Sequence, residues 1–182
     1  IVPNIASHTA GLQKVFSVSC KPAVWLAMFG TMGMLRVFAA DYTWTGAANA
    51  LWNATDANWT GAGAVWVNGA ANNALFGAAG PKAVEAAPVT LNNLSFSADG
   101  YTVSGGPLLM YGDADVGDGM NAVLAASVTN VGVWEKTGTG TLALDAGSTA
   151  SNVFSSLKAV GGTLRHASGT TLVTLVGGNP ES

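Results

Sequence analysis

Short stretches in which apolar and polar side chains alternate recur along the chain after residue 40, with Gly, Asn, Asp and Ser between them. A period of two is typical of strands with one buried face. No stretch of this part sustains the i, i+3, i+4 apolar spacing of an amphipathic helix. The pattern therefore predicts an all-β chain. The expected strands are residues 64–67, 89–91, 94–96, 101–103, 108–110, 131–133, 142–144, 157–160 and 171–173.

Two segments of the chain are repeated at nearly the same offset. GTLALDAG at 140–147 returns as GTLRHASG at 162–169, and GAANALW at 46–52 returns as GAANNALF at 69–76. One turn of a parallel β-solenoid uses a little over twenty residues, which is the offset of both pairs, whereas a β-sandwich gives no reason for a fixed offset. Chance repetition in a chain rich in Gly, Ala and Thr is the alternative. The offsets predict a parallel β-helix.

Four tryptophans, Trp44, Trp52, Trp59 and Trp66, follow one another at intervals of eight, seven and seven residues. The open end of a solenoid exposes strand edges and core, which large aromatic side chains can cover. We therefore expect residues 41–85 to form a Trp-rich cap and residues 86–182 to form the solenoid turns. A carbohydrate-binding aromatic platform is the alternative for the same four residues.

The first forty residues differ from the rest of the chain. Lys21 precedes an uncharged apolar run at 23–35, and small residues follow at Ala39 and Ala40. A basic flank, a short apolar core and a small-residue cleavage point are typical of a secretory signal. As a helix the run spans about 20 Å, too little for a hydrocarbon core of about 30 Å. We expect residues 1–40 to be an extended, helical signal peptide cut after Ala39 or Ala40, with an internal buried helix as the alternative.

Composition and charge restrict the class of protein further. Hydrophobic residues make up 49% of the chain, charged residues 9%, and there are 24 glycines, a balance that excludes a disordered chain. All ten acidic residues lie after residue 40 against four basic ones, which gives a net charge near −6 and argues against a nucleic-acid partner. The sole cysteine, Cys20, lies before the apolar run, so no disulfide is expected after residue 40.

Two glycine- or aspartate-rich motifs are candidates for chemistry. Gly138, Gly140 and Ala143 match a loose dinucleotide fingerprint, but the alternation that follows them predicts a strand where that site needs a helix. Asp113, Asp115 and Asp118 could hold a hard cation, but their spacing does not fit an EF-hand, and a solvated turn is favoured.

His166 is the only histidine after residue 40, and no nucleophile elbow accompanies it. We therefore expect a non-enzymatic protein with no catalytic, cofactor-binding or metal-binding residues. A secreted β-helix lyase or hydrolase acting on polysaccharide is the alternative.

The segment from Lys136 to Leu164 carries a resemblance to a known family. Its pattern K-x-G-x-G-x-L-x-L, followed by a loop and then V-x-G-x-L, is similar to the passenger-associated β-strand repeat of autotransporters. The Trp-rich stretch before it also resembles the start of such passengers. The loop differs, because Ser151–Ser155 reads SNVFS with Phe154 at the aromatic position. The repeat residues are Lys136, Gly138, Gly140, Leu142, Leu144, Gly147, Phe154, Val160, Gly162 and Leu164.

The resemblance implies a right-handed parallel β-helix that is exported through the periplasm and displayed at the outer membrane, on the cell surface or as a secreted protein. It implies as partners the export machinery and a carboxy-terminal or separate outer-membrane β-barrel, with host or neighbouring cells as contacts of an adhesin-like stalk. No barrel strands are expected before Ser182. Within the repeat we expect Gly138 and Gly140 to form a corner that excludes side chains. Leu142 and Leu144 should face inward, with Lys136 solvated at the corner.

Overall fold

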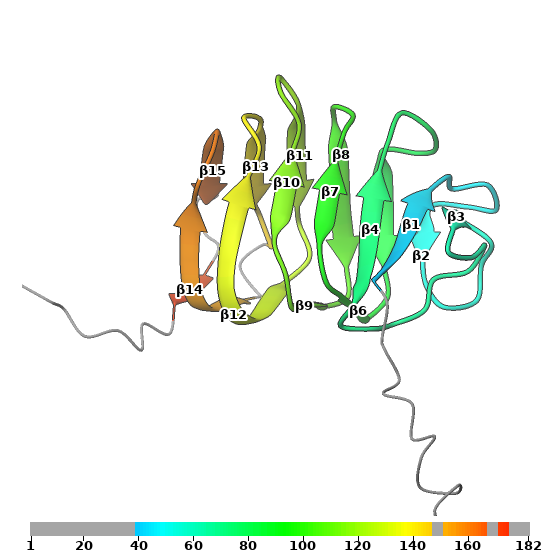
Figure 1. Ribbon diagram of the computed structural model, residues 1–182, viewed down its shortest axis with the longest axis horizontal. Helices are drawn as coiled ribbons and strands as arrows, with labels where there is room; N and C mark the ends of the chain where they lie inside the picture. The colour runs from blue at the N-terminus through cyan, green and yellow to red at the C-terminus, as the bar shows by residue number, and fades with distance from the viewer. Residues whose placement is uncertain (1–38, 147–150, 167–170, 175–182) are drawn as a thin grey trace, which may run out of the picture. The chain divides into compact units, whose positions relative to one another are not determined.

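The computed structural model describes residues 39–146, 151–166 and 171–174 of the compact unit Val37–Ser182 (Figure 1). The described residues confirm the prediction of an all-β chain: they contain strands and no helix, and so no helix that could cross a membrane. The predicted signal segment before Ala39, Cys20 and Gly147 lie outside them. The strands are β1 (Ala40–Trp44), β2 (Leu51–Trp52), β3 (Trp59–Gly61), β4 (Asn72–Phe76), β5 (Ala83–Ala86), β6 (Val89–Leu91), β7 (Leu94–Phe96), β8 (Tyr101–Gly105), β9 (Leu108–Met110), β10 (Ala114–Val116), β11 (Asn121–Leu124), β12 (Val128–Thr137), β13 (Thr141–Leu144), β14 (Ser151–Ala159), β15 (Thr163–His166) and β16 (Thr171–Thr174).

Successive turns stack their strands in parallel, which makes the described residues a β-solenoid of about four turns. One six-stranded sheet has the order β15-β13-β11-β8-β5-β2. In it Leu142 of β13 lies opposite Leu164 of β15 and Ala122 of β11. The predicted offset between the two GTL segments is therefore the register of two neighbouring turns.

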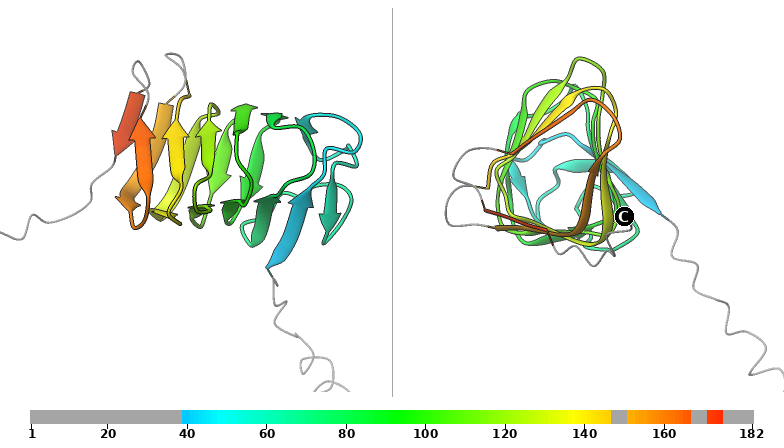
Figure 2. Two further views of the ribbon diagram at one scale, coloured as in Figure 1. Left: turned by 90° about the horizontal axis from the view of Figure 1, so that it is seen from above. Right: turned by 90° about the vertical axis from the view of Figure 1, so that its left-hand side faces the viewer.

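A ten-stranded sheet forms the other sides of the solenoid. Its main order is β16-β14-β12-β10-β7-β4-β1-β3, and β9 joins β6 to β12. The long strand β12 turns from one side to the next, because Val128–Asn130 pair with β9 and Lys136 and Thr137 pair with β10. The view along the stack in Figure 2 shows the sides closing around one core.

The first turn departs from the regular register. Ala40 of β1 lies opposite Asn72 of β4, whereas Ala74 of β4 lies opposite Leu94 of β7, so the first turn contains a longer stretch of chain than the second. The strand β3 uses the extra chain length to pair antiparallel with the outer edge of β1. An antiparallel edge strand ends the parallel stack on this side.

Two details of the prediction for this region are wrong. The repeat of residues 46–52 at 69–76 is not structural, because β2 belongs to the six-stranded sheet and β4 to the ten-stranded one. Residues 64–67 form no strand either. They lie in the loop that brings Trp66 into the core, where its indole Nε1 donates a hydrogen bond to Asn68 Oδ1 at 2.9 Å. Packing of the tryptophan prevails there over the local alternation.

The core fills the inside of the solenoid and follows a period-two alternation in strands such as β8, β11 and β13. Leu142 and Leu144 of β13 are 0% and 1% exposed, as the alternation predicts, and Phe154 of β14 is also buried. Phe154 packs against Trp134 of the preceding turn with ring centroids 4.9 Å apart. Burial of each such side chain stabilises the fold by roughly 1.5–3 kcal/mol, and the neighbouring turns bury most of its surface.

Candidate functional site

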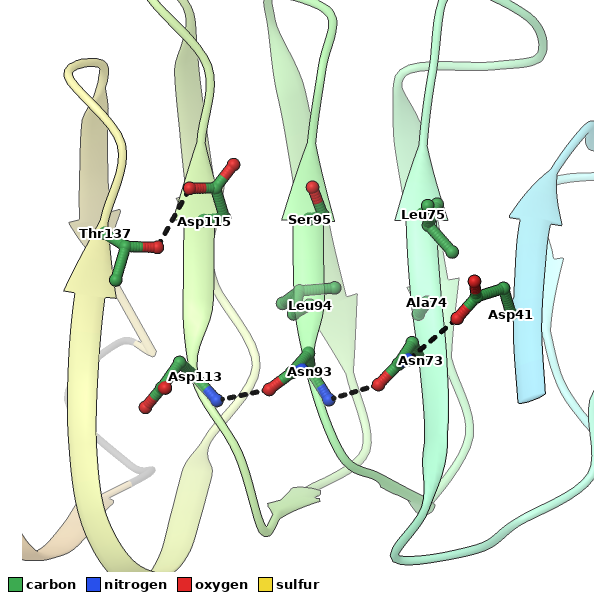
Figure 3. A pocket seen from close by; sticks show the side chains of 10 residues that line it. All are labelled: Asp41, Asn73, Ala74, Leu75, Asn93, Leu94, Ser95, Asp113, Asp115 and Thr137. Carbon is green, nitrogen blue, oxygen red and sulfur yellow. Dashed lines mark hydrogen bonds between the residues drawn. The ribbon is translucent and has the colours of Figure 1, made fainter. Parts of the chain in front are cut away.

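The candidate functional site is an open polar groove on the outer face of the ten-stranded sheet. It encloses about 320 Å³ and crosses β1, β4, β7, β10 and β12 (Figure 3). Alternation places every second residue of these strands outward, so the groove repeats the same outward positions from turn to turn. Its lining residues are Asp41, Asn73, Ala74, Leu75, Asn93, Leu94, Ser95, Asp113, Asp115 and Thr137.

A ladder of side-chain hydrogen bonds runs along one border of the groove. Asn73 Nδ2 donates to Asp41 Oδ1 at 2.7 Å, and the backbone N–H of Asn93 donates to Asn73 Oδ1 at 3.2 Å. The N–H of Asp113 donates to Asn93 Oδ1 at 2.8 Å, and the N–H of Glu135 donates to Asp113 Oδ1 at 2.9 Å. Each side chain after Asp41 thus accepts a backbone N–H of the next turn, and Figure 3 shows the bonds that link Asp41, Asn73, Asn93 and Asp113.

A second row of outward residues crosses the groove two positions further along each strand. It consists of Leu75, Ser95, Asp115 and Thr137, in register on β4, β7, β10 and β12. Thr137 Oγ1 donates a hydrogen bond to Asp115 Oδ1 at 2.8 Å. Together the rows present carboxylates, amides, hydroxyls and the apolar side chain of Leu75, and the lining includes no histidine, lysine or arginine. Such a surface can hydrogen-bond to a hydroxyl-rich or cationic contact.

The three aspartates weighed as a cation site do not come together. Asp113 and Asp115 line the groove, whereas Asp118 lies in the turn after β10 and accepts a hydrogen bond from Thr139 Oγ1 at 2.8 Å. Within the described ranges no three His, Cys, Asp or Glu residues are placed to hold a metal ion. The expectation of a solvated turn fits Asp118 but is wrong for Asp115, which lies within strand β10.

Lys136 is the clearest error of the sequence interpretation, because it is buried inside the solenoid and not solvated at a corner. It is 0% exposed, and its Nζ donates to Gly138 O at 2.6 Å, Gly140 O at 2.7 Å and Gly161 O at 3.0 Å. Alternation along β12 puts Lys136 on the inward face with Trp134. Burial lowers the pKa of Lys136 below its ordinary 10.5, while the charge of nearby Asp115 acts in the opposite direction.

Room for Lys136 comes from its neighbours in the adjacent turns. The residues paired with it on either side are Ala114 of β10 and Ala159 of β14. Two small side chains leave space for the four-carbon stem of the lysine in a position that apolar residues occupy elsewhere in the stack. All three N–H donors of the ammonium are used, which is the condition for burying a charge without an ion pair.

The glycines of the repeat form a corner where side chains do not fit. Gly138 has a φ of +69°, and a Cβ there would clash with the carbonyl oxygen of Val116 in the preceding turn. A Cβ on Gly140 would clash with the carbonyl oxygen of Gly117, and one on Gly162 with that of Gly140. The strand β13 follows directly, so the helix that a dinucleotide site requires is absent at this position.

The four predicted cap tryptophans are brought together in the core of the first turn. Trp44, Trp52, Trp59 and Trp66 are at most 2% exposed. Trp59 contacts Trp44, Trp52 and Trp66 with ring centroids 5.1–5.2 Å apart. Buried rings cannot stack on a sugar, so the carbohydrate-platform alternative for these residues is wrong.

Other predicted residues lie at the margins of the fold. Val160 is 53% exposed, Leu164 is partly buried against the core, and His166 is exposed at the end of β15. Ala40 is the first residue of β1, and Ala39 precedes it.

Sequence reasoning missed two polar features. The groove ladder could have been found from Asn72-Asn73, Asn92-Asn93 and Gly112-Asp113, which are evenly spaced along the chain. The second feature is Asn58, whose side chain is 1% exposed. Its Oδ1 accepts the N–H groups of Ala48 and Asn49, each at 2.9 Å, and its Nδ2 donates to Leu51 O at 2.8 Å. It thereby holds the loop before β2, and no local pattern predicts that role.

No protein-family model, curated protein or solved structure matches this chain.

Proposed function

We propose that this chain is the exported passenger of an autotransporter, a non-enzymatic, adhesin-like stalk with a right-handed β-helix. In this proposal residues 1–40 act as the signal peptide and are removed after Ala39 or Ala40. Residues 41–85 cap the helix, and an outer-membrane β-barrel, carboxy-terminal or separate, carries the passenger to the cell surface or the medium. The observation that carries the proposal is the solenoid built around the Lys136-Gly138-Gly140 corner.

The groove supplies the contact surface of the proposed stalk. It presents Asp41, Asp113 and Asp115 with amide and hydroxyl groups, and its lining has no histidine, lysine or arginine. A hydrogen-bonding surface of this kind suits contact with a host or neighbouring cell through hydroxyl-rich or cationic groups. No cofactor is required for such a role.

A signal-processing and display experiment tests the proposal. The full chain, followed by an outer-membrane β-barrel, is expressed in a Gram-negative host and compared with a chain that lacks residues 1–40. The proposal predicts a mature amino terminus at Ala40 or Asp41 and digestion by protease added to intact cells. A chain that keeps residues 1–40 and stays protected inside the cell contradicts the proposal.

A polysaccharide-cleaving enzyme is the second candidate, because Asp113 and Asp115 lie close together in an open groove. Incubation of the full chain with a panel of neutral and acidic polysaccharides distinguishes the two functions. Cleavage that is lost in Asp113→Asn and Asp115→Asn would support the enzyme and contradict the stalk. Binding without cleavage would support the stalk.

A further inference from the structure

We infer that Lys136 and Asn152 fix the register in which the turn containing β14 stacks on β12, one on each side of an irregularity in the pairing of these strands. This inference concerns folding of the solenoid and does not rest on the proposed function. The two residues are the buried polar side chains that link β12 to the following turn in the part of the chain that the structure describes.

The pairing of β12 with β14 is not continuous. Asn130 lies opposite Phe154 and Val133 lies opposite Ser156, so β12 contains one residue more than β14 between these two pairs, and the register shifts there. Because of this shift, alignment of the first half of β12 does not determine alignment of the second half. Each half needs its own means of selecting one register.

Asn152 selects the register of the first half. It is 0% exposed, and its Oδ1 accepts the backbone N–H of Val128, the first residue of β12, at 2.8 Å. Its Nδ2 finds no hydrogen-bond partner among the described residues. An asparagine half-satisfied in this way contributes less stability than a leucine would, since a buried amide donor without a partner is unfavourable. It does, however, specify one alignment of β14.

Lys136 selects the register of the second half. Two of its hydrogen bonds go to carbonyls of its own corner, at Gly138 and Gly140, but the third goes to Gly161 of the next turn. The next turn therefore has to place a carbonyl oxygen where the ammonium points, or an N–H donor of a buried charge stays unpaired. A slip by two residues keeps the inward and outward faces of a strand, so hydrophobic burial alone does not exclude it. A buried polar group does exclude it, and register selection is the best-attested role of such groups.

Disulfide trapping in the full chain tests the inference. In a Cys20→Ser background, Glu135→Cys is combined with Lys158→Cys to report the observed register, or with Ser156→Cys or Val160→Cys to report slips by two residues. Neighbouring strands lie about 4.8 Å apart, whereas a slipped partner lies about 8 Å away in the observed register, beyond the reach of a disulfide. Each pair is oxidised with Lys136 present and with Lys136→Met, which keeps the length of the side chain but removes its charge and donors.

With Lys136 present, the 135/158 pair alone is expected to form a disulfide. With Lys136→Met, the 135/156 or 135/160 disulfide is expected to rise at least several-fold. An unchanged pattern overturns the inference for Lys136, and so does a Met variant that shows no β-sheet circular dichroism, because a register-selecting residue is not required for the solenoid to form.

Asn152→Leu provides an independent test on the other half of β12. Thr129→Cys is paired with Val153→Cys for the observed register and with Ser151→Cys or Ser155→Cys for the slipped ones. Slipped disulfides that appear only with Asn152→Leu support the inference. If no slipped disulfide forms in either background, the inference for Asn152 is overturned.

Discussion

Leu142 and Leu164 lie directly opposite each other in the parallel strands β13 and β15, although a whole turn of the solenoid separates them along the chain. Leu142 is fully buried, whereas Leu164 lies in a later turn and is only partly buried. Leucine at the same position of two turns is thus buried to different extents. Comparing the two leucines therefore measures how much stacking of a neighbouring turn contributes to stability.

Truncation of these two leucines should have unequal effects. Leu142→Ala is expected to lower the free energy of unfolding by about 2–5 kcal/mol, as for a fully buried leucine. Leu164→Ala should cost less than half as much, and Val160→Ala, at an exposed position, should change little. Urea denaturation followed by tryptophan fluorescence measures all three. Equal losses at Leu142 and Leu164 would contradict the stacking described here.

Two glycines with the same φ allow the cost of a left-handed backbone to be distinguished from the cost of a steric clash. Gly138 and Gly119 have φ values of +69° and +70°, but a Cβ on Gly119 meets no atom within 4 Å, whereas one on Gly138 clashes with Val116 O. Gly119→Ala should cost about 1–2 kcal/mol for the left-handed conformation alone. Gly138→Ala should cost at least twice that amount. Thermal denaturation of both variants checks this, and equal melting temperatures would show that the corner is not tightly packed.

The ladder along the groove contributes to stability through Asn93. Its Oδ1 accepts the N–H of Asp113, so Asn93→Ala leaves that N–H without its partner and should cost about 1–2 kcal/mol. Ser95→Ala is the matched control, because Ser95 lies outward on the same strand and its hydroxyl has no hydrogen bond to the described residues. Urea denaturation should find the control within about 0.5 kcal/mol of the unaltered chain. A larger loss for Ser95→Ala than for Asn93→Ala would contradict the role of the ladder.

Lys136 makes the stability depend on pH in the alkaline range. Because burial lowers its pKa in the folded chain below 10.5, the unfolded chain binds more protons between the folded pKa and 10.5. The contribution of Lys136 to the free energy of unfolding therefore rises with pH across that window and is complete above 10.5. Urea denaturation from pH 7 to 10.5 should show the unaltered chain gaining stability relative to Lys136→Met.

The control for this pH effect is Lys158→Met. Lys158 is 61% exposed and forms a surface ion pair with Glu135 at 3.0 Å, so its removal should leave the alkaline trend intact. If the free energy of unfolding rises by the same amount between pH 7 and 10.5 in Lys136→Met as in the unaltered chain, another group is responsible. The same conclusion follows if the rise disappears in Lys158→Met.

The regular turns were predictable because their signal is local and repeated. Alternation identified most of the strands from β6 onward, and the GTL repeat gave the register of β13 and β15. The first turn was less predictable, since β3 pairs antiparallel with β1 and the loop around Trp66 is shaped by the aromatic cluster. Such pairings depend on contacts between distant residues, which one local pattern does not contain.

The polar features were harder to predict than the strands. The apolar alternation at 131–133 would put Val131 and Val133 on the buried face, but both are exposed, and Trp134 and Lys136 face inward in β12 instead. The carbonyls that accept hydrogen bonds from Lys136 belong to glycines, and one of them lies in the next turn. Likewise the groove joins residues of five strands, β1, β4, β7, β10 and β12, and only their stacking makes them neighbours.

Hydrogen-bond scalar couplings measured by NMR test the parallel stacking of turns most directly. The structure predicts couplings from the amide nitrogen of Thr141 to the carbonyl carbon of Met120 and from that of Thr163 to that of Gly140, whose N···O distances are 2.8 Å and 3.1 Å. Couplings from these two amides to carbonyls within about ten residues in sequence would instead indicate antiparallel hairpins. That result would contradict the solenoid and the proposals built on it.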